Sequence, residues 1–370
     1  MPADVDPALD TLLLPFANGD LIWPVHGGAL FLRARDGWPL HRQPLPGLIC
    51  EQPFKPDVDA LLGSGLRVND APSESRYPLV LVLPPRQREE ARALFVEAIA
   101  RAAPGGIVIA CMPNSEGAKS GEADLARLAG PLHSISKHHC RVFWTSPLDG
   151  AIDPSSAISA MAVSARAAAG VAADAPRPVA DGRFVSRPGV FAWNRIDAAS
   201  ALLAAQLPTD LAGHGADLGA GYGYLAAEVL TRCPAVTTLD VYEADARALA
   251  LARTNLAAFA QRALLGFHWH DVVAGLLTQG LLTQDLSAQG LQVGYDFIVS
   301  NPPFHAQGRT DRPELGRAFI AAAADALQPR GRLLLVANRH LPYEAILAAR
   351  FDTVRTLAQQ AGFKVIEARR

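Results

Sequence analysis

Short apolar runs separated by helical stretches organise the chain from residue 79 onward. Five consecutive apolar residues at 79–83 predict a buried strand that stops at a double proline, and residues 87–102 carry apolar side chains on one stripe, which predicts a helix. The runs that follow predict, in order, a strand at 107–110, a helix at about 121–130 and a strand at 141–144. This alternation predicts a parallel α/β layer, whereas residues 1–75 show no comparable pattern.

A second set of apolar runs fills the C-terminal half of the chain. Runs near residues 215, 239, 267, 298, 335, 354 and 365 predict the strands of a seven-stranded sheet. Between the two halves, residues 146–182 are rich in Pro, Ser, Ala and Asp, which is typical of a connector. We therefore predict a first domain at 1–150, a linker at 151–182 and a second domain at 183–370.

Composition and charge narrow the class of protein. Of the 370 residues, 50% are hydrophobic and 19% are charged, which is typical of a globular enzyme large enough for two cores. The formal net charge of −2 gives no overall basic field of the kind that marks many nucleic-acid-binding proteins. The four cysteines are scattered, and neither a signal peptide nor a long apolar segment is visible, so we expect a cytoplasmic protein with no membrane span.

The loop that follows the apolar run 297–299 carries the most specific chemistry. The prolines Pro302 and Pro303 cannot continue a strand, so it must end at Asn301 and leave a stiff loop where open α/β sheets bind ligands. The side-chain oxygen of Asn301 and the carbonyl of Pro302 form a pair of acceptors for an exocyclic –NH2 group. Phe304 is suited to stacking on a planar ring. The loop therefore predicts a site that aims an aromatic amine at an electrophile, without a strong general base.

A glycine-rich turn at 216–225 predicts a second ligand site. Its spacing is D-x-G-x-G-x-G-x-L, and a helical run follows, so a ligand can approach the backbone and the free N–H groups of the helix. Glu243 ends the next predicted strand, 22 residues after Gly221, where an acid can hold the hydroxyls of a ribose. Asp217 in the turn would repel a pyrophosphate and suits an ammonium group. This favours S-adenosylmethionine over a nicotinamide dinucleotide.

Other polar residues extend these two sites. Asp271 ends a further predicted strand and suits an adenine amine. Arg309 and Arg312 follow the double proline, where they can bind phosphates. His268 and His270 share one strand face and resemble a pair of metal ligands. Since no third ligand accompanies them, we expect no metal.

These motifs resemble those of class I S-adenosylmethionine-dependent methyltransferases, and more narrowly the RsmC-like bacterial ribosomal RNA guanine-N2 methyltransferases. The resemblance is carried by residues 217–223, Glu243 and the loop 300–305, and it extends to 188–191, 336–343 and 363–365. It covers 183–370 well and 78–145 weakly. It implies two tandem Rossmann-like methyltransferase domains: a catalytic C-terminal domain with a seven-stranded class I sheet, and a degenerate N-terminal one.

The resemblance also implies roles for single residues. Phe191 and Asp197 would cover the pocket. The implied catalytic loop is Asn301, Pro302, Pro303 and Phe304. The implied cofactor site comprises Asp217, Gly219, Ala220, Gly221, Gly223, Glu243, Asp271, Val272 and Asn301. The implied substrate contacts are Phe191, His305, Arg309 and Arg312.

The expected reaction is methyl transfer from S-adenosylmethionine to the N2 amine of a guanine in ribosomal RNA, with the small subunit favoured. Alternatives are a guanine of the large-subunit rRNA, adenine or a protein glutamine as the acceptor. A nicotinamide oxidoreductase would leave Asp217 and the double-proline loop unexplained, and a non-enzymatic RNA-binding ribosome-assembly factor would use the first domain alone. The expected partner is ribosomal RNA or a ribosomal subunit, with no membrane. The sequence does not indicate the target nucleotide or the oligomeric state.

Overall fold

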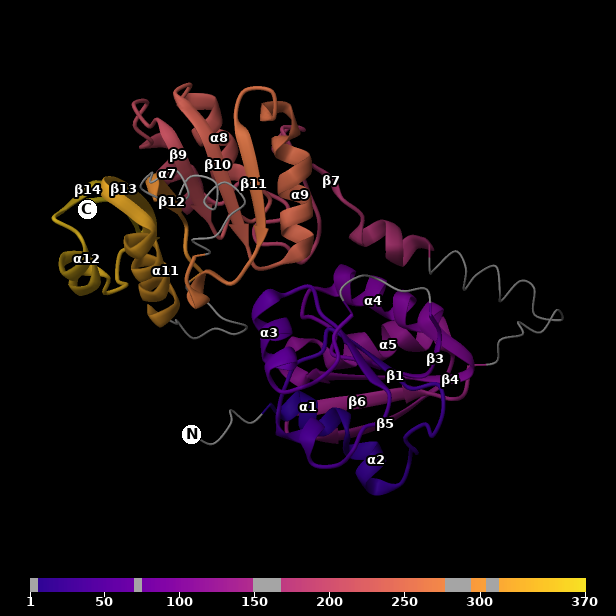
Figure 1. The fold of residues 1–370 in the computed structure, drawn as a ribbon. Helices are drawn as coiled ribbons and strands as arrows, with labels where there is room; N and C mark the ends of the chain where they lie inside the picture. Colours follow the sequence, from indigo (N-terminus) through magenta and orange to yellow (C-terminus); the bar gives the residue numbers. More distant parts are fainter. Residues whose placement is uncertain (1–5, 70–74, 149–167, 277–293, 304–312) are drawn as a thin grey trace. The chain divides into compact units, whose positions relative to one another are not determined.

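The computed structural model describes residues 6–69, 75–148, 168–276, 294–303 and 313–370 of the chain (Figure 1). Its contacts divide it into two compact units. Unit 1 comprises Met1–Pro176 with Arg187–Gly189, and unit 2 comprises Arg177–Ser186 with Val190–Arg370. The division falls inside the predicted linker at 151–182, of which residues 151–167 lie outside the described residues.

Unit 1 is built around a mixed sheet with helices on both faces. Within its described residues the sheet has six strands in the order β2-β1-β3-β4-β6-β5. The strands are β1 (Ala29–Leu32), β2 (Leu48–Glu51), β3 (Tyr77–Val82), β4 (Ala102–Pro113), β5 (Leu132–Lys137) and β6 (Cys140–Thr145). Its helices include α1 (Pro7–Leu12), α2 (Leu14–Asn18), α3 (Lys55–Gly63), α4 (Arg88–Arg101) and α5 (Ala118–Ala129), with short 3-10 turns at Trp38–His41 and Asn114–Glu116, and residues 168–174 are also helical.

The prediction that this layer is parallel is wrong at one edge of the sheet. β6 runs antiparallel to both β4 and β5, whereas β1 to β4 are parallel. The reason is the tight turn between β5 and β6, where His138 and His139 take positive φ angles of 51° and 58°. Two residues can join antiparallel strands but are far too few for a parallel crossover. β1 and β2 lie in the stretch that showed no pattern, because each has only four residues.

Unit 2 confirms the predicted seven-stranded sheet. Within its described residues the strand order is β11-β10-β9-β12-β13-β15-β14. The strands are β9 (Gly213–Leu218), β10 (Val236–Glu243), β11 (Leu264–Trp269), β12 (Tyr295–Ser300), β13 (Leu327–Asn338), β14 (Thr353–Gln360) and β15 (Phe363–Arg369), and a separate hairpin pairs β7 (Arg177–Val179) with β8 (Phe184–Ser186). The helices are α7 (Ala198–Ala205), α8 (Tyr224–Arg232), α9 (Ala246–Leu256), α11 (Pro313–Ala326) and α12 (Glu344–Arg350), with 3-10 turns at Ala257–Phe259 and Val272–Ala274.

Both faces of this sheet are buried. Helices α7, α8 and α9 pack on one face, against alternate strand residues such as Phe297 and Val299, and α11 and α12 pack on the other, against residues such as Ile298 (Figure 1). This explains why the central strands read as continuous apolar runs. Gly215 on β9 is required by the packing, because a Cβ there would lie 2.0 Å from the ring of Phe297.

The strand order places a topological switch point between β9 and β12. From β9 the chain runs outward through β10 to β11, then returns to β12 on the other side of β9. Asp217 pairs in register with Val299 and Leu218 with Ser300, so both strands end at the same level. Ser300 also donates a side-chain hydrogen bond to the carbonyl of Leu218 at 2.8 Å. The loops that leave these two strands therefore face each other, as expected of a ligand site in an open α/β sheet.

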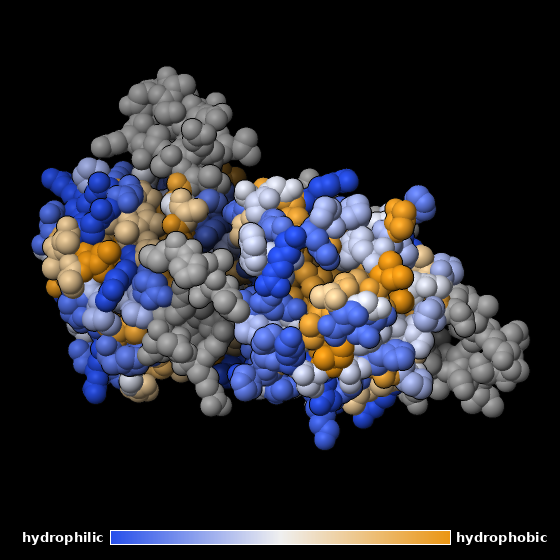
Figure 2. Space-filling model, turned by 90° about the horizontal axis from the view of Figure 1, so that it is seen from below, coloured by the Kyte–Doolittle hydropathy of each residue, from blue (hydrophilic) through white to orange (hydrophobic). Residues whose placement is uncertain are grey.

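One face of the molecule shows its hydrophobic side chains in small groups (Figure 2). On the face drawn in Figure 2, apolar residues are interspersed with hydrophilic ones and form no continuous belt. Across the described ranges, none of the helices combines the length and apolar character that crossing a bilayer requires.

Candidate active site

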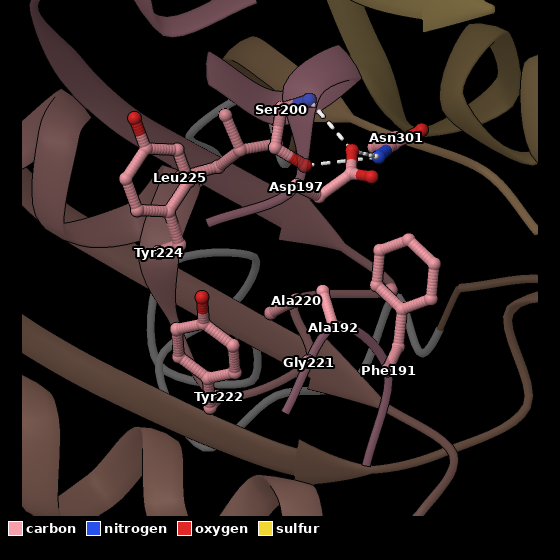
Figure 3. Close-up of a pocket in the computed structure, with 11 residues that line it drawn as sticks. Phe191, Ala192, Asp197, Ser200, Ala220, Gly221, Tyr222, Tyr224, Leu225 and Asn301 are labelled. Carbon is pink, nitrogen blue, oxygen red and sulfur yellow. Dashed lines mark hydrogen bonds between the residues drawn. The ribbon is translucent and has the colours of Figure 1, made fainter. Parts of the chain in front are cut away.

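A pocket opens at the switch point of unit 2 (Figure 3). Its walls come from the glycine-rich turn after β9, the start of α8, the segment before α7 together with the first turn of α7, and the end of β12. The residues that line it are Phe191, Ala192, Asp197, Ser200, Gly219, Ala220, Gly221, Tyr222, Tyr224, Leu225 and Asn301. The two motifs singled out in the sequence, the glycine turn and Asn301, are thus brought together by the fold.

The glycine-rich turn is held by backbone hydrogen bonds to β10. The N–H groups of Gly219 and Ala220 both donate to the carbonyl of Tyr242, at 2.9 and 3.0 Å. Gly219, Gly221 and Gly223 take positive φ angles of 71°, 57° and 90°, which side chains with a Cβ rarely adopt. The turn therefore keeps a bare backbone against the pocket, and Gly223 ends it as the N-cap of α8.

Asp217 lies at the base of this turn and is fully buried, with 0% exposure. Its Oδ2 atom accepts a hydrogen bond from the N–H of Ala226 at 2.9 Å, whereas Oδ1 has no partner among the described residues. Burial, opposed in part by the hydrogen bond from Ala226, raises the pKa of this carboxyl from 3.8 to about 7. A buried acceptor without a partner is costly, and a cationic ligand group beside it would remove that cost. Asp217 is not among the residues that line the pocket itself.

Glu243 stands at the end of β10, next to the glycine turn. Its Oε2 atom accepts a hydrogen bond from the N–H of Gly221 at 2.7 Å, and its Oε1 atom accepts one from the N–H of Asp245 at 2.8 Å. Burial raises the pKa of this carboxyl. Each carboxylate oxygen can accept a second hydrogen bond, so the group keeps capacity for ligand hydroxyls while the backbone fixes its orientation.

Asn301 is anchored by Asp197 and Ser200, which lie at the start of α7 and line the same pocket. Its Nδ2 atom donates to Oδ2 of Asp197 at 3.1 Å and to Oγ of Ser200 at 2.9 Å (Figure 3). Its Oδ1 atom has no hydrogen-bond partner in the part of the chain that the structure describes. The amide is therefore held by its nitrogen and keeps its oxygen as an available acceptor. Pro302, whose carbonyl was predicted to assist, is buried, and Pro303 is exposed.

Other predicted site residues lie apart from the pocket or outside the described residues. Asp271 caps a 3-10 turn by accepting from the N–H of Val273 at 2.9 Å, and Val272 is buried in the core against α11. Neither lines the pocket, so their roles toward adenine stay predictions. The remaining predicted contacts, Phe304, His305, Arg309 and Arg312, lie outside the described residues.

The two histidines that resemble metal ligands have other partners. Nε2 of His268 lies 2.9 Å from Oδ1 of Asp240, and Nε2 of His270 lies 2.5 Å from the carbonyl oxygen of Gly275. Among the described residues, no group of three or more His, Cys, Asp or Glu side chains is arranged to hold a metal ion.

The structure adds pocket residues that the sequence reasoning missed. Phe191 lines the pocket as predicted and is 60% exposed, but Ala192 beside it and Ser200 were not singled out. Tyr222 donates from its hydroxyl to the carbonyl of Arg195 at 3.1 Å, which ties the glycine turn to the segment before α7. The available signal was Asp197 directly before an Ala-rich helical run, which is the pattern of a helix N-cap.

Comparisons with known proteins agree with this geometry. The family model of the methyltransferase small domain matches residues 181–367. Ribosomal RNA small subunit methyltransferase C of Pseudomonas paraeruginosa is 32% identical over 320 residues, 85% of each chain. The protein of the same name from Pseudomonas aeruginosa (strain LESB58) is 34% identical over 304 residues, 81% of each chain.

A solved structure also shares the fold. The chain is similar to the 16S rRNA N2 G1207 methyltransferase of T. thermophilus, solved in complex with AdoMet and guanosine. The TM-score is 0.74 at 24% identity, and the match covers 100% of this chain and 93% of that one. At this identity the likeness establishes a common two-domain fold.

Proposed function

This chain belongs to the family of the ribosomal RNA small subunit methyltransferases C, and on that basis we propose that it transfers a methyl group from S-adenosylmethionine to the exocyclic N2 amine of a guanine in small-subunit ribosomal RNA. The names of the relatives support the small-subunit RNA as substrate, in preference to the large-subunit RNA, adenine or glutamine. The AdoMet and guanosine held by the T. thermophilus protein support the cofactor and the acceptor base.

The residues around the glycine turn fit S-adenosylmethionine. When bound, this cofactor supplies a methyl group activated by a sulfonium centre. Oδ1 of buried Asp217, which has no partner among the described residues, suits the ammonium of its methionine end, and the turn is open at Gly221, where a Cβ would meet nothing within 4 Å. The free acceptor capacity of Glu243 suits two ribose hydroxyls.

The observation that carries the proposal is the position and orientation of Asn301. It lines the same pocket as Gly219 and Gly221, and its amide oxygen is left as an acceptor. An aromatic amine is a poor nucleophile because its lone pair is delocalised into the ring. We propose that Oδ1 of Asn301, with the carbonyl of Pro302, takes the two amine hydrogens and so turns the lone pair toward the methyl group.

This arrangement accounts for catalysis without a strong base. Positioning of reacting groups supplies about 7–11 kcal/mol of a barrier in favourable cases. The amine proton becomes acidic only once its nitrogen has formed the new bond to carbon, so it can then pass to water. A target guanine inside a helix would first be extruded from the stack, at a cost of a few kcal/mol.

The test uses rRNA from a strain that lacks this protein. The wild-type chain is expected to incorporate labelled methyl groups into that rRNA and to yield N2-methylguanosine on nucleoside mass spectrometry. Asn301→Ala is expected to lower the rate by about 10²–10³-fold, as for the loss of one preorganised polar contact at a reacting centre. Formation of N6-methyladenosine, or no incorporation at all, would refute the proposal.

A further inference from the structure

We propose that Asp197 and Ser200 are positioning residues, which hold the Asn301 amide as an acceptor and strengthen that acceptor with the charge of Asp197. This inference rests on the proposed function, and it concerns α7, which no sequence motif connects to the double-proline loop. The contact joins residues 104 positions apart in the chain.

Hydrogen bonds link Asp197, Ser200 and Asn301 to one another. Asp197 is the N-cap of α7, and its Oδ2 atom accepts from the N–H of Ser200 at 2.9 Å. The same Oδ2 atom accepts from Nδ2 of Asn301 at 3.1 Å, and Oγ of Ser200 accepts the other hydrogen of that nitrogen at 2.9 Å (Figure 3). Both N–H donors of the amide are therefore used inside the protein.

This set decides which end of the amide is left for a ligand. A carboxylate is acceptor-only, so turning the Asn301 amide over would place its oxygen against Oδ2 of Asp197 and lose a hydrogen bond. Only the amide oxygen of Asn301 remains for a ligand, and this oxygen can accept hydrogen bonds but cannot donate them. A ligand group that contacts this oxygen must therefore be a donor such as –NH2, and a carbonyl or a bare ring nitrogen would be disfavoured at the same place.

The charge of Asp197 acts through the amide. A carboxylate that accepts from Nδ2 draws its N–H bond toward itself and increases the electron density on Oδ1, because chained hydrogen bonds polarise one another. The amine nitrogen gains positive charge as it bonds to the methyl carbon. The chain from carboxylate to amide to amine is therefore stronger in the transition state than in the ground state, which is the condition for lowering the barrier.

The helix that carries these residues is packed into the core. Ser200 is 8% exposed and Leu203 of the same helix is fully buried in the core that α7 shares with α8 and α9. α7 also packs against β13 and β15. Asp197 and Ser200 thus present fixed acceptors to Asn301 rather than adapting to it.

Single variants separate three contributions of Asp197: its negative charge, the length of its side chain and its capping of α7. Asp197→Asn keeps a good N-cap and an acceptor but removes the charge, and Asp197→Ser keeps a cap but is too short to reach Asn301. Ser200→Ala removes the second acceptor. Asp6→Asn is the control for loss of charge at a helix N-cap in unit 1, because Asp6 caps α1 by accepting from the N–H groups of Ala8 and Leu9; it also pairs with Arg35. For each variant we would measure the single-turnover rate of N2-methylguanosine formation in rRNA from a strain lacking the protein, the calorimetric affinity for S-adenosylhomocysteine, and the thermal midpoint.

We expect Asp197→Asn and Ser200→Ala to lower the rate about 10-fold and Asp197→Ser up to about 100-fold, the range for hydrogen bonds to charged groups. The affinity of Asp197→Asn for S-adenosylhomocysteine should match that of Asp6→Asn, and its thermal midpoint should fall no further than that of Asp6→Asn, which also loses the ion pair with Arg35. In an Asn301→Ala background, Asp197→Asn should cause no further loss, because its effect passes through that amide.

Two results would overturn the inference while the proposed function stands. One is a wild-type rate in Asp197→Asn, and the other is a full additional loss when Asp197→Asn is combined with Asn301→Ala. A wild-type protein that forms no N2-methylguanosine would instead overturn the proposed function, and this inference with it.

Discussion

Replacing Asp217 by asparagine should make the ligand-free protein less sensitive to pH. The folded state raises the pKa of this buried carboxyl from 3.8 to about 7, so it binds the proton more tightly than the unfolded chain does. The stability contributed by this group is therefore complete below about pH 4 and is lost as the pH rises to about 7. The asparagine side chain of the variant does not titrate, so this loss would disappear.

The size of the effect follows from the raised pKa. Between pH 5 and the folded pKa of about 7, the free energy of unfolding of the wild-type protein falls by about 1.4 kcal/mol per pH unit. The total loss between pH 5 and pH 8 is therefore about 3 kcal/mol. The asparagine nitrogen would occupy the position of Oδ1, which has no partner in the described ranges, at a cost of about 1–3 kcal/mol, but that cost is the same at both pH values. The stability of Asp217→Asn relative to wild type should thus rise by about 3 kcal/mol between pH 5 and pH 8.

Thermal denaturation at the two pH values measures this difference. For a domain of about 150–250 residues such as unit 2, 1 kcal/mol shifts the midpoint by about 2–4 °C, so unit 2 of the variant should gain about 6–12 °C relative to wild type on going from pH 5 to pH 8. Asp325→Asn serves as the control, because that carboxylate is 70% exposed and its replacement should shift both midpoints equally. If Asp217→Asn also shifts both midpoints equally, the buried carboxyl does not titrate as argued. The same variant should lose affinity for S-adenosylhomocysteine, since its amide cannot neutralise an ammonium.

Two further substitutions test the fold and the cofactor site. Gly215→Ala should destabilise unit 2 by about 1–3 kcal/mol in denaturant unfolding, because its Cβ would overlap the ring of Phe297, whereas Gly63→Ala in unit 1 has open space around it and should cost under about 0.5 kcal/mol. Equal effects of the two would contradict the packing argument. Glu243→Gln should weaken calorimetric binding of S-adenosylhomocysteine about 10-fold or more, because the amide gives up one of the two carboxylate acceptors; unchanged affinity would exclude Glu243 from the ribose.

Much of unit 2 was predictable from local sequence. Strands that are buried on both faces must be apolar throughout. Runs such as 297–299 can therefore be predicted as strands without knowing which strands lie beside them in the sheet. The glycine turn and Glu243 were also visible, because positive φ angles favour glycine and because an acid that ends a buried strand faces a ligand edge. Unit 1 was harder, since β1 and β2 are four residues long and resemble ordinary loop segments.

The candidate site divides in the same way. The sequence by itself determined which groups were available: an amide before two prolines at Asn301, a carboxylate in a glycine turn at Asp217, and an acid at Glu243. Only the tertiary structure decided that the N-cap of α7 holds the Asn301 amide and that Oδ1 of Asp217 is buried without a partner among the described residues. The physical reason is that motifs are read from neighbours along the chain, whereas hydrogen bonding and burial depend on which distant segments the sheet order brings together.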